Sequence, residues 1–241
     1  MTTSTYKIKI GDIGIDVIRK EIKNLHLAVY PPNGRVRIAA PLRVDDESVR
    51  LFGVSKIPWI KKQKSKYENQ QRETKREYIT GESHYLFGKR YLLKVAEENK
   101  PARVEIKGKH IYLFVRPNST QLRREEIVTE WYRSELKKHI PALIEKWQQV
   151  TAVKATEWRV KRMKTRWGTC NKKINRIWLN LELAKKPVYC LDYIIVHELV
   201  HLLEKNHTDQ FKVRMDKFIP QWRAYREELN RLILNHQDWD Y

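Results

Sequence analysis

The sequence predicts an α+β protein, in which a β-rich N-terminal region precedes a C-terminal domain that combines helices with a short sheet. Apolar and polar residues alternate over much of residues 6–40 and 79–117, a pattern that is typical of half-buried strands. Beyond them the apolar residues recur mostly at helical spacing, with charged residues between them. We therefore divide the chain near residue 118 into two domains, 1–118 and 119–241, and find no evident internal repeat.

The composition is that of a globular protein with a strongly basic surface. Of the 241 residues, 41% are hydrophobic, which is enough for a proper core. A formal charge of +20 favours an anionic partner such as nucleic acid or nucleotide, although a solvated basic surface explains it equally well. With only Cys170 and Cys190 there is no disulfide framework, so we expect a reducing compartment. Because no apolar leader or membrane-spanning run is present, we expect a cytoplasmic protein with no membrane partner.

The N-terminal region contains two predicted groups of strands with helices between them. Residues 25–29 and 36–38 flank a Pro-Pro-Asn-Gly turn, and residues 104–115 are predicted to form a hairpin around a glycine. A helix is predicted from residue 45, where Asp-Asp-Glu-Ser supplies a cap and an acidic first turn. The next predicted helix is almost entirely Lys, Gln, Glu and Arg after its first turn, so we expect an exposed basic helix over about residues 58–77.

The C-terminal domain is predicted to begin with a long helix and to continue with two strands. The helical spacing runs over residues 121–149, and Pro141 predicts a kink or a break within it. Residues 157–164 and 176–180 alternate as strands, and a turn-rich segment over residues 168–175 separates them.

A helix near the end of the chain carries a metal-binding motif. It is apolar on nearly all sides, so we expect it to be buried, yet it contains His197, Glu198 and His201 in the pattern His-Glu-x-x-His. Histidines four residues apart lie on one helical face and can hold one ion, while the glutamate reaches its water. Burying these polar groups is costly unless they have partners. His207 follows on a predicted turn and completes three ligands, which leaves a fourth position for water as in catalytic zinc sites.

Spacing alone leaves an acidic ligand as an alternative to the third histidine. Glu204 shares the helix face with His201, and Asp209 lies close in sequence to His207. Asp209 is also a candidate to accept the second ring N–H of a ligand histidine, because zinc histidines commonly need such a partner. We predict that three histidines bind Zn²⁺, because no acidic residue downstream outranks His207.

Several segments of the C-terminal domain together resemble a known family. They are Arg-Trp-Gly-Thr-Cys at 166–170, Ile-Trp-Leu-Asn at 177–180, the motif-bearing segment 191–201, and Asn-His at 206–207 with Phe211. This set resembles the YgjP-like metallopeptidase domain, which is similar to the SprT-type and WLM-type proteases. Departures are mild, such as Thr in place of Ser in the first segment. The resemblance implies a zincin-like domain with a short sheet and a buried HExxH helix.

The resemblance and the chemistry of the motif imply a zinc-dependent hydrolase, most simply a metallopeptidase in which Glu198 activates a zinc-bound water. Candidates for substrate contacts are the basic residues Arg162, Lys164 and Arg166, together with Asn180 on an expected edge strand. Because arginine and lysine suit phosphate, hydrolysis of nucleoside triphosphates is an alternative to peptide hydrolysis. A zinc-stabilised nucleic-acid-binding module without catalysis is a second alternative, motivated by the net charge of +20.

Overall fold

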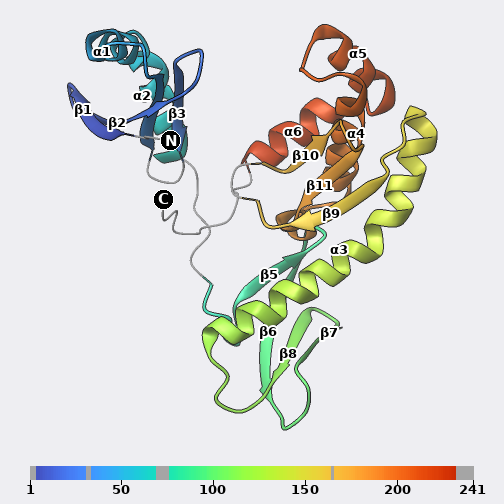
Figure 1. The fold of residues 1–241 in the computed structure, drawn as a ribbon. Coiled ribbons are helices and arrows are strands. Elements are labelled where there is room, and N and C mark those ends of the chain that lie inside the picture. Colours follow the sequence, from blue (N-terminus) through green and yellow to red (C-terminus); the bar gives the residue numbers. More distant parts are fainter. Residues whose placement is uncertain (1–3, 31–33, 69–75, 164–165, 232–241) are drawn as a thin grey trace. The chain divides into compact units, whose positions relative to one another are not determined.

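The computed structural model describes residues 4–30, 34–68, 76–163 and 166–231, and Figure 1 shows the arrangement of the elements within each part of the chain. In these residues the chain combines six α-helices with three β-sheets, which confirms the predicted α+β class. None of the described helices has the length and apolarity that crossing a bilayer requires.

The chain divides into two compact units between Arg72 and Glu73. We predicted a boundary near residue 118, where strand patterns give way to helical ones, and the observed division does not coincide with it. The difference arises because the long helix after residue 118 packs onto the strands that precede it, so these strands and the helix belong to one unit.

The first unit is a four-stranded sheet followed by two helices. Its elements are β1 (Thr5–Ile10), β2 (Ile13–Lys20), β3 (His26–Tyr30), β4 (Arg35–Pro41), α1 (Asp46–Ser55) and α2 (Ile57–Glu68). The strands lie in the order β1-β2-β4-β3, with antiparallel outer pairs and a parallel β2–β4 pair. Alternate residues such as Val17 and Ile38 are fully buried and form the core. The predicted cap is present, because the Asp45 carboxylate accepts a hydrogen bond from the Ser48 N–H at 2.7 Å.

The basic helix α2 is shorter than predicted. It ends at Glu68, and residues 76–77, the last described part of the predicted helix, are not helical; residues 69–75 lie outside the described part of the chain. Its first turn is anchored because Ile60 is fully buried in the core of the first unit. Lys61 and Lys62 are exposed, as the composition predicts. With few apolar residues after Ile60, packing stabilises only the first part of the segment.

The second unit holds the remaining elements, which form two sheets and four α-helices in its described residues. They are β5 (Ser83–Leu86), β6 (Lys89–Glu97), β7 (Arg103–Lys107), β8 (His110–Val115), α3 (Gln121–Thr151), β9 (Glu157–Lys161), β10 (Gly168–Asn171), β11 (Arg176–Asn180), the 3₁₀-helix η1 (Leu181–Lys185), α4 (Val188–Leu203), α5 (Asp209–Phe218) and α6 (Trp222–Arg231).

The two four-stranded sheets share one topology, although no internal repeat is evident in the sequence. The second sheet has the order β5-β6-β8-β7, again with antiparallel outer pairs and a parallel central pair. Every hairpin in both sheets has a glycine with positive φ at its turn, namely Gly11, Gly34, Gly88 and Gly108. The repeat is not evident in the sequence because the two sheets share only their glycine turns and the alternation of buried and exposed residues, while their side chains differ.

The long helix α3 runs without a break from Gln121 to Thr151 and includes Pro141. Of the predicted kink or break, the break is absent, although proline removes one backbone donor from the helix. Buried residues on both sides of it, Leu136, Ile140 and Ile144, hold the helix against the core. Tertiary packing thus outweighs the local cost of the proline.

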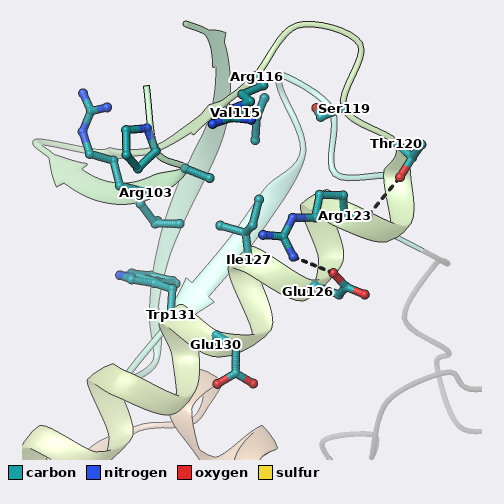
Figure 2. A pocket seen from close by; sticks show the side chains of 13 residues that line it. Arg103, Val115, Arg116, Ser119, Thr120, Arg123, Glu126, Ile127, Glu130 and Trp131 are labelled. Atoms are coloured by element: carbon teal, nitrogen blue, oxygen red, sulfur yellow. Dashed lines mark hydrogen bonds and ion pairs between the residues drawn. The ribbon is translucent and has the colours of Figure 1, made fainter. Parts of the chain in front are cut away.

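Helix α3 covers one face of the β5–β8 sheet. Val115 of β8 and Val128 of α3 are buried in the same core. Near β7 the helix and the sheet leave a groove of about 900 Å³, and Figure 2 shows Ile127 and Trp131 of α3 beside it. Val115 faces α3. Because strand residues alternate between faces, every second residue of β8, beginning next to Val115, lies on the opposite face of the sheet.

The other sheet of the second unit has the order β10-β11-β9, and α4 packs against it. The central strand β11 is antiparallel to β10 and parallel to β9. We predicted that residues 168–175 are a turn-rich segment, but Gly168–Asn171 form the edge strand β10. Glycine and asparagine have low strand propensity, so this strand depends on its pairing with β11.

A buried histidine connects the β5–β8 sheet to α3. His84 is 2% exposed; its Nε2 lies 3.2 Å from a Glu82 carboxylate oxygen, and its Nδ1 lies 3.4 Å from the Tyr132 hydroxyl. Burial, followed by the charge of Arg76, lowers the pKa of His84 from 6.5 to about 4. The ring is therefore neutral in the folded protein at neutral pH.

We predict that His84 makes the second unit sensitive to acid. Since its folded-state pKa is depressed, its contribution to stability is present above pH 6.5 and is lost as the pH falls toward about 4. Through this group alone, the free energy of unfolding should drop by about 2 kcal/mol between about pH 7.5 and pH 5. Denaturant unfolding of the native chain and of His84→Gln, which cannot titrate, measures this difference. Equal losses of stability in both proteins would contradict the assignment.

Candidate metal centre

Helix α4 places two histidines and a glutamate inside the C-terminal part of the second unit. It begins after Pro187, and it packs against β10, β11, α3, α5 and α6. Ten of its sixteen residues are buried, among them the apolar side chains on every side of the motif. The polar groups of His197, Glu198 and His201 are therefore held in surroundings where charges and unpaired donors are costly.

Three imidazole rings meet at one point beside α4. The Nε2 atoms of His197 and His201 are 3.1 Å apart, and Nε2 of His207 lies 3.1 Å from the first and 3.2 Å from the second. His197 and His201 lie one helical turn apart, while His207 comes from the segment between α4 and α5. Their ring nitrogens form a group that can hold one metal ion.

Burial disfavours the charged form of two of these rings, His197 and His207. It lowers the pKa of His197 to about 3, with further lowering by His201 and His207, and it also lowers the pKa of His207. Nδ1 of His201 lies 3.0 Å from the Glu204 carbonyl oxygen, so a proton on Nδ1 leaves the Nε2 lone pair free for a metal. Nδ1 of His197 is buried and has no hydrogen-bond partner among the described residues.

Phe211 packs against all three rings. Its centroid lies 5.0 Å from that of His197, 4.7 Å from that of His201 and 4.8 Å from that of His207. Phe211 is 1% exposed, and the N-terminal cap of α5 positions it, because the Thr208 hydroxyl accepts a hydrogen bond from the Phe211 N–H at 3.3 Å. The start of α5 therefore orients the third histidine and supports the other two.

Glu198 lies beside the histidines and is 3% exposed. Burial raises its pKa to about 8, against a smaller opposing effect of the Arg166 charge. Gly168 of β10 makes this position possible, because a Cβ at residue 168 would lie 2.5 Å from Oε1 of Glu198 and 2.8 Å from Ile194. The edge strand thus approaches the carboxylate at a distance that only glycine permits.

The four metal-site residues line a cavity of about 1340 Å³. Its walls come mainly from β10, β11, α4, α5 and α6, and they include the aromatic rings of Trp167, Trp178 and Trp222. Glu198 is the one carboxylate among the described lining residues. The basic residues of the lining are Lys161, Arg166, Lys172, Lys173, Lys205, Lys212 and Arg226. The cavity therefore favours a substrate that carries negative charge.

The predicted substrate contacts have different positions in the structure. Arg166 lines the cavity, whereas Lys164 lies outside the described residues. Arg162 instead belongs to a separate polar cluster, where it pairs with Glu125 at 3.1 Å and donates to the Thr129 hydroxyl at 3.2 Å. Arg162 follows the end of β9, and its contacts with Glu125 and Thr129 of α3 hold its side chain in that cluster.

The role predicted for Asn180 is not supported by its position. It belongs to β11, the central strand of its sheet and not an edge, and its side chain is 0% exposed. Its Nδ2 donates to the carbonyls of Met163 and Arg166 at 2.8 and 2.7 Å, and its Oδ1 accepts from the N–H groups of Met163 and Glu182. Asn180 therefore fixes the loop before β10 and has no surface for substrate.

The two acidic alternatives to a histidine ligand also lie elsewhere. The side chain of Asp209 is 94% exposed and pairs with Lys212 at 2.8 Å. The Glu204 carboxylate lies 3.5 Å from Arg214, and only its backbone carbonyl contacts a ring nitrogen of the site. Neither carboxylate joins the group formed by the three histidines.

Sequence inspection missed two residues that the fold brings to the site. Tyr193 packs edge-on against His197 with ring centroids 5.7 Å apart, and Arg226 of α6 lines the cavity. Tyr193 lies one helical turn before His197, a spacing that is a usable signal for contact. Arg226 carried no such signal, since it is one of many basic residues on an amphipathic helix.

Three converging histidines beside a buried carboxylate are typical of a metal-dependent hydrolase. The family model described as YgjP-like, metallopeptidase domain, matches residues 23–232. The chain therefore belongs to the YgjP-like family, which confirms the resemblance seen in the sequence and supports a metal-dependent peptidase.

Comparisons with curated proteins and with solved structures add little to this assignment. No curated protein matches the chain. The metallopeptidase zymogen abylysin of Pyrococcus abyssi is 19% identical, with a TM-score of 0.37, over 40% of this chain and 98% of its own. The zymogen jannalysin of Methanocaldococcus jannaschii is 20% identical, with a TM-score of 0.34, over 37% of this chain and 92% of its own. Both likenesses are too weak for a property of either protein to be transferred.

We predict that Phe211→Leu weakens metal binding by about tenfold, because supports of metal ligands typically contribute this much or more to affinity. Leucine keeps most of the buried volume but has no flat ring to pack against the three imidazoles. Metal is first removed from the protein with a chelator. Calorimetric titration with zinc then measures the affinity of the protein for zinc. Met215→Leu is the control, since Met215 is buried on the same helix. Equal affinities in the two variants would show that Phe211 does not support the rings.

Proposed function

We propose that this chain is a zinc-dependent peptidase in which His197, His201 and His207 bind Zn²⁺ and Glu198 is the general base. The observation that carries the proposal is the triangle of Nε2 atoms, with sides of 3.1, 3.1 and 3.2 Å. Tetrahedral zinc with Zn–N distances of about 2.0–2.1 Å requires ligand nitrogens about 3.3 Å apart. The triangle is close to one face of such a tetrahedron.

The protonation of the rings agrees with this assignment. Three ring nitrogens this close repel one another unless a cation or a proton lies between them, and the depressed pKa of about 3 at His197 disfavours a proton. Imidazole must be neutral to bind a metal. A donor set of three histidines with no thiolate, and with room for a water, is typical of catalytic zinc.

In the proposed mechanism Glu198 moves the proton. Zinc, when bound, would polarise the scissile carbonyl and lower the pKa of a water molecule. The Glu198 carboxylate takes a proton from this water and passes it to the leaving amine. Glu198 is placed for both steps, because it is the one carboxylate among the described residues that line the cavity with the three histidines. Arg166, whose charge acts on Glu198, lines the same cavity and is a candidate to stabilise the negative charge that develops on the substrate.

The edge strand β10 offers a place for an extended peptide. One side of β10 pairs with β11, and all four of its residues, Gly168 to Asn171, line the cavity. An edge strand has unpaired backbone groups that can bind a substrate backbone as an added strand. With seven basic residues around the same cavity, we expect peptides with acidic residues to be preferred.

A second candidate function is the hydrolysis of nucleoside triphosphates. The basic lining of the cavity is the observation that favours it, because arginine and lysine bind phosphates by charge and hydrogen bonding. The same three histidines and Glu198 would serve, so the two candidates differ only in the substrate.

The experiment that tests the function is hydrolysis by native protein and by Glu198→Gln. We expect the variant to keep its zinc and to lose hydrolysis by about 1000-fold, because glutamine cannot accept the proton. Parallel assays with unfolded casein and with nucleoside triphosphates identify the substrate class, and elemental analysis measures zinc. Glu204→Gln, which changes a nearby carboxylate outside the group of ligands, is the matched control.

The outcomes of this experiment distinguish the proposed peptidase from its alternatives. Full activity of Glu198→Gln on the true substrate would show that Glu198 is not the base. Cleavage of nucleoside triphosphates without cleavage of casein would establish the second candidate. If neither substrate is cleaved and His201→Ala unfolds the protein, zinc has a structural role.

We predict that Gly168→Ala lowers hydrolysis by about 100-fold while zinc is retained, since a displacement of about 1 Å can cost this much. The new methyl group would overlap Oε1 of Glu198 and move the carboxylate away from its position. Gly14→Ala is the control, because no atom lies within 4 Å of a Cβ at that position. Initial rates and zinc content measured together test this prediction, and an unaltered rate would refute the proposed position of the base.

A further inference from the structure

The face of the β5–β8 sheet that α3 does not cover carries a row of rings. On β8, Ile111, Leu113 and Val115 are buried in the core that the sheet shares with α3. Because strand residues alternate between faces, the other three residues of β8 lie on the opposite face, where they are only partly buried. They are His110, Tyr112 and Phe114.

Two of these rings lie side by side in nearly parallel planes. The centroids of Tyr112 and Phe114 are 6.1 Å apart, and their planes differ by 17°. β8 is an inner strand of a four-stranded sheet, so the rings lie well inside the face. Unpaired bases stack on aromatic side chains, and aromatic rings on a four-stranded sheet are a known way of binding two or three successive bases.

Cationic side chains from both neighbouring strands lie over the rings. The Arg103 guanidinium is 3.8 Å from the centroid of Phe114, Lys94 is 5.4 Å from that of Tyr112, and Lys107 is 5.6 Å from both. The register of the sheet fixes this arrangement, because Arg103 pairs with Phe114 and Lys94 pairs with Tyr112. Aromatic rings together with cations are the groups that bind the bases and the phosphates of a nucleic acid strand.

The charge of this face complements a phosphate backbone. Two carboxylates contact these cations: Glu105 of β7 lies 2.7 Å from both Arg103 and Lys107, and Glu98, which follows β6, forms a further ion pair with Arg103. These carboxylates hold the cations in place, and phosphates can replace them as partners. By the alternation of β6 and β7, the charged residues of the face are Arg90, Lys94, Arg103, Lys107 and Glu105.

The fold itself does not require the row of rings. The sheet of the first unit has the same topology, and β4 occupies the place of β8. There Val36, Ile38 and Ala40 are buried, and the alternate positions are Arg35, Arg37 and Ala39. A sheet of this topology therefore forms with no ring on its third strand, so the rings of β8 are a feature of this sheet alone.

We propose that this face binds single-stranded nucleic acid, with bases stacked on Tyr112 and Phe114 and phosphates paired with Lys94, Arg103 and Lys107. The site lies on the β5–β8 sheet and uses none of the residues that line the metal cavity. Its function is therefore separable from hydrolysis.

Fluorescence anisotropy of a labelled 20-nucleotide strand with the full-length chain tests the proposal. The probes are oligo-uridine, oligo-thymidine and a duplex of equal length. We expect tighter binding of the single strands, and a decrease in affinity of at least about tenfold in Tyr112→Leu/Phe114→Leu, because each stacked base contributes substantially to affinity. Tyr112→Phe/Phe114→Tyr, which keeps both rings, should bind like the native chain and controls for damage to the sheet.

The pairing of cations with phosphates has a separate measurement. Lys94→Ala/Lys107→Ala should reduce the slope of log affinity against log salt by about 0.7 for each phosphate that is no longer neutralised. Lys137→Ala/Lys154→Ala removes the same charge from exposed positions elsewhere in the second unit and should leave affinity within about twofold. Absence of binding by the native chain at low salt, tighter binding of the duplex, or native affinity in the leucine variant would each overturn the proposal.

Discussion

The convergence of three imidazole rings on one point is the constraint on which the C-terminal part of the structure depends. Helix periodicity alone brings His197 and His201 together. His207 lies after the end of α4, so the chain must fold back to bring it to the other two. The cap at Thr208 and the ring of Phe211 fix this return, so α5 acts as a support for the site. A site of this kind is stable only with all three rings neutral, and burial keeps His197 in that state.

Burial of α4 also explains the properties of the proposed base. The helix is packed on the β10-β11-β9 sheet and enclosed by helices, so Glu198 lies where its charge is poorly solvated and its pKa rises. Gly168 allows the edge strand to approach the carboxylate, and Asn180 holds the loop that leads into that strand. Together these contacts place a strand edge, the proposed base and the candidate metal site around one cavity, an arrangement that suits peptide hydrolysis.

Local chemistry made part of this arrangement predictable from the sequence. The spacing of His197 and His201 and the cap at Asp45 depend on neighbours within a few residues, so a pattern reveals them. The α+β class followed from the same kind of periodicity. The position of the Arg162 side chain could not be predicted in this way, because its pairing with Glu125 on another element turns it away from the cavity.

Packing decided the features that patterns could not show. The strand at residues 168–171 exists through its pairing with β11, and α3 continues through Pro141 because both of its halves are held in the core. The repeated sheet topology is likewise carried by hydrogen bonding and glycine turns. It provides two similar scaffolds, of which only the second bears the aromatic row, so a shared fold does not imply a shared role.

X-ray absorption spectroscopy at the zinc edge of the purified protein tests the central claim most directly. We expect three imidazole nitrogens at about 2.0–2.1 Å and one oxygen at a similar distance. A sulfur scatterer at about 2.3 Å would instead place Cys170 or Cys190 on the metal, and the absence of zinc would contradict the proposed donor set.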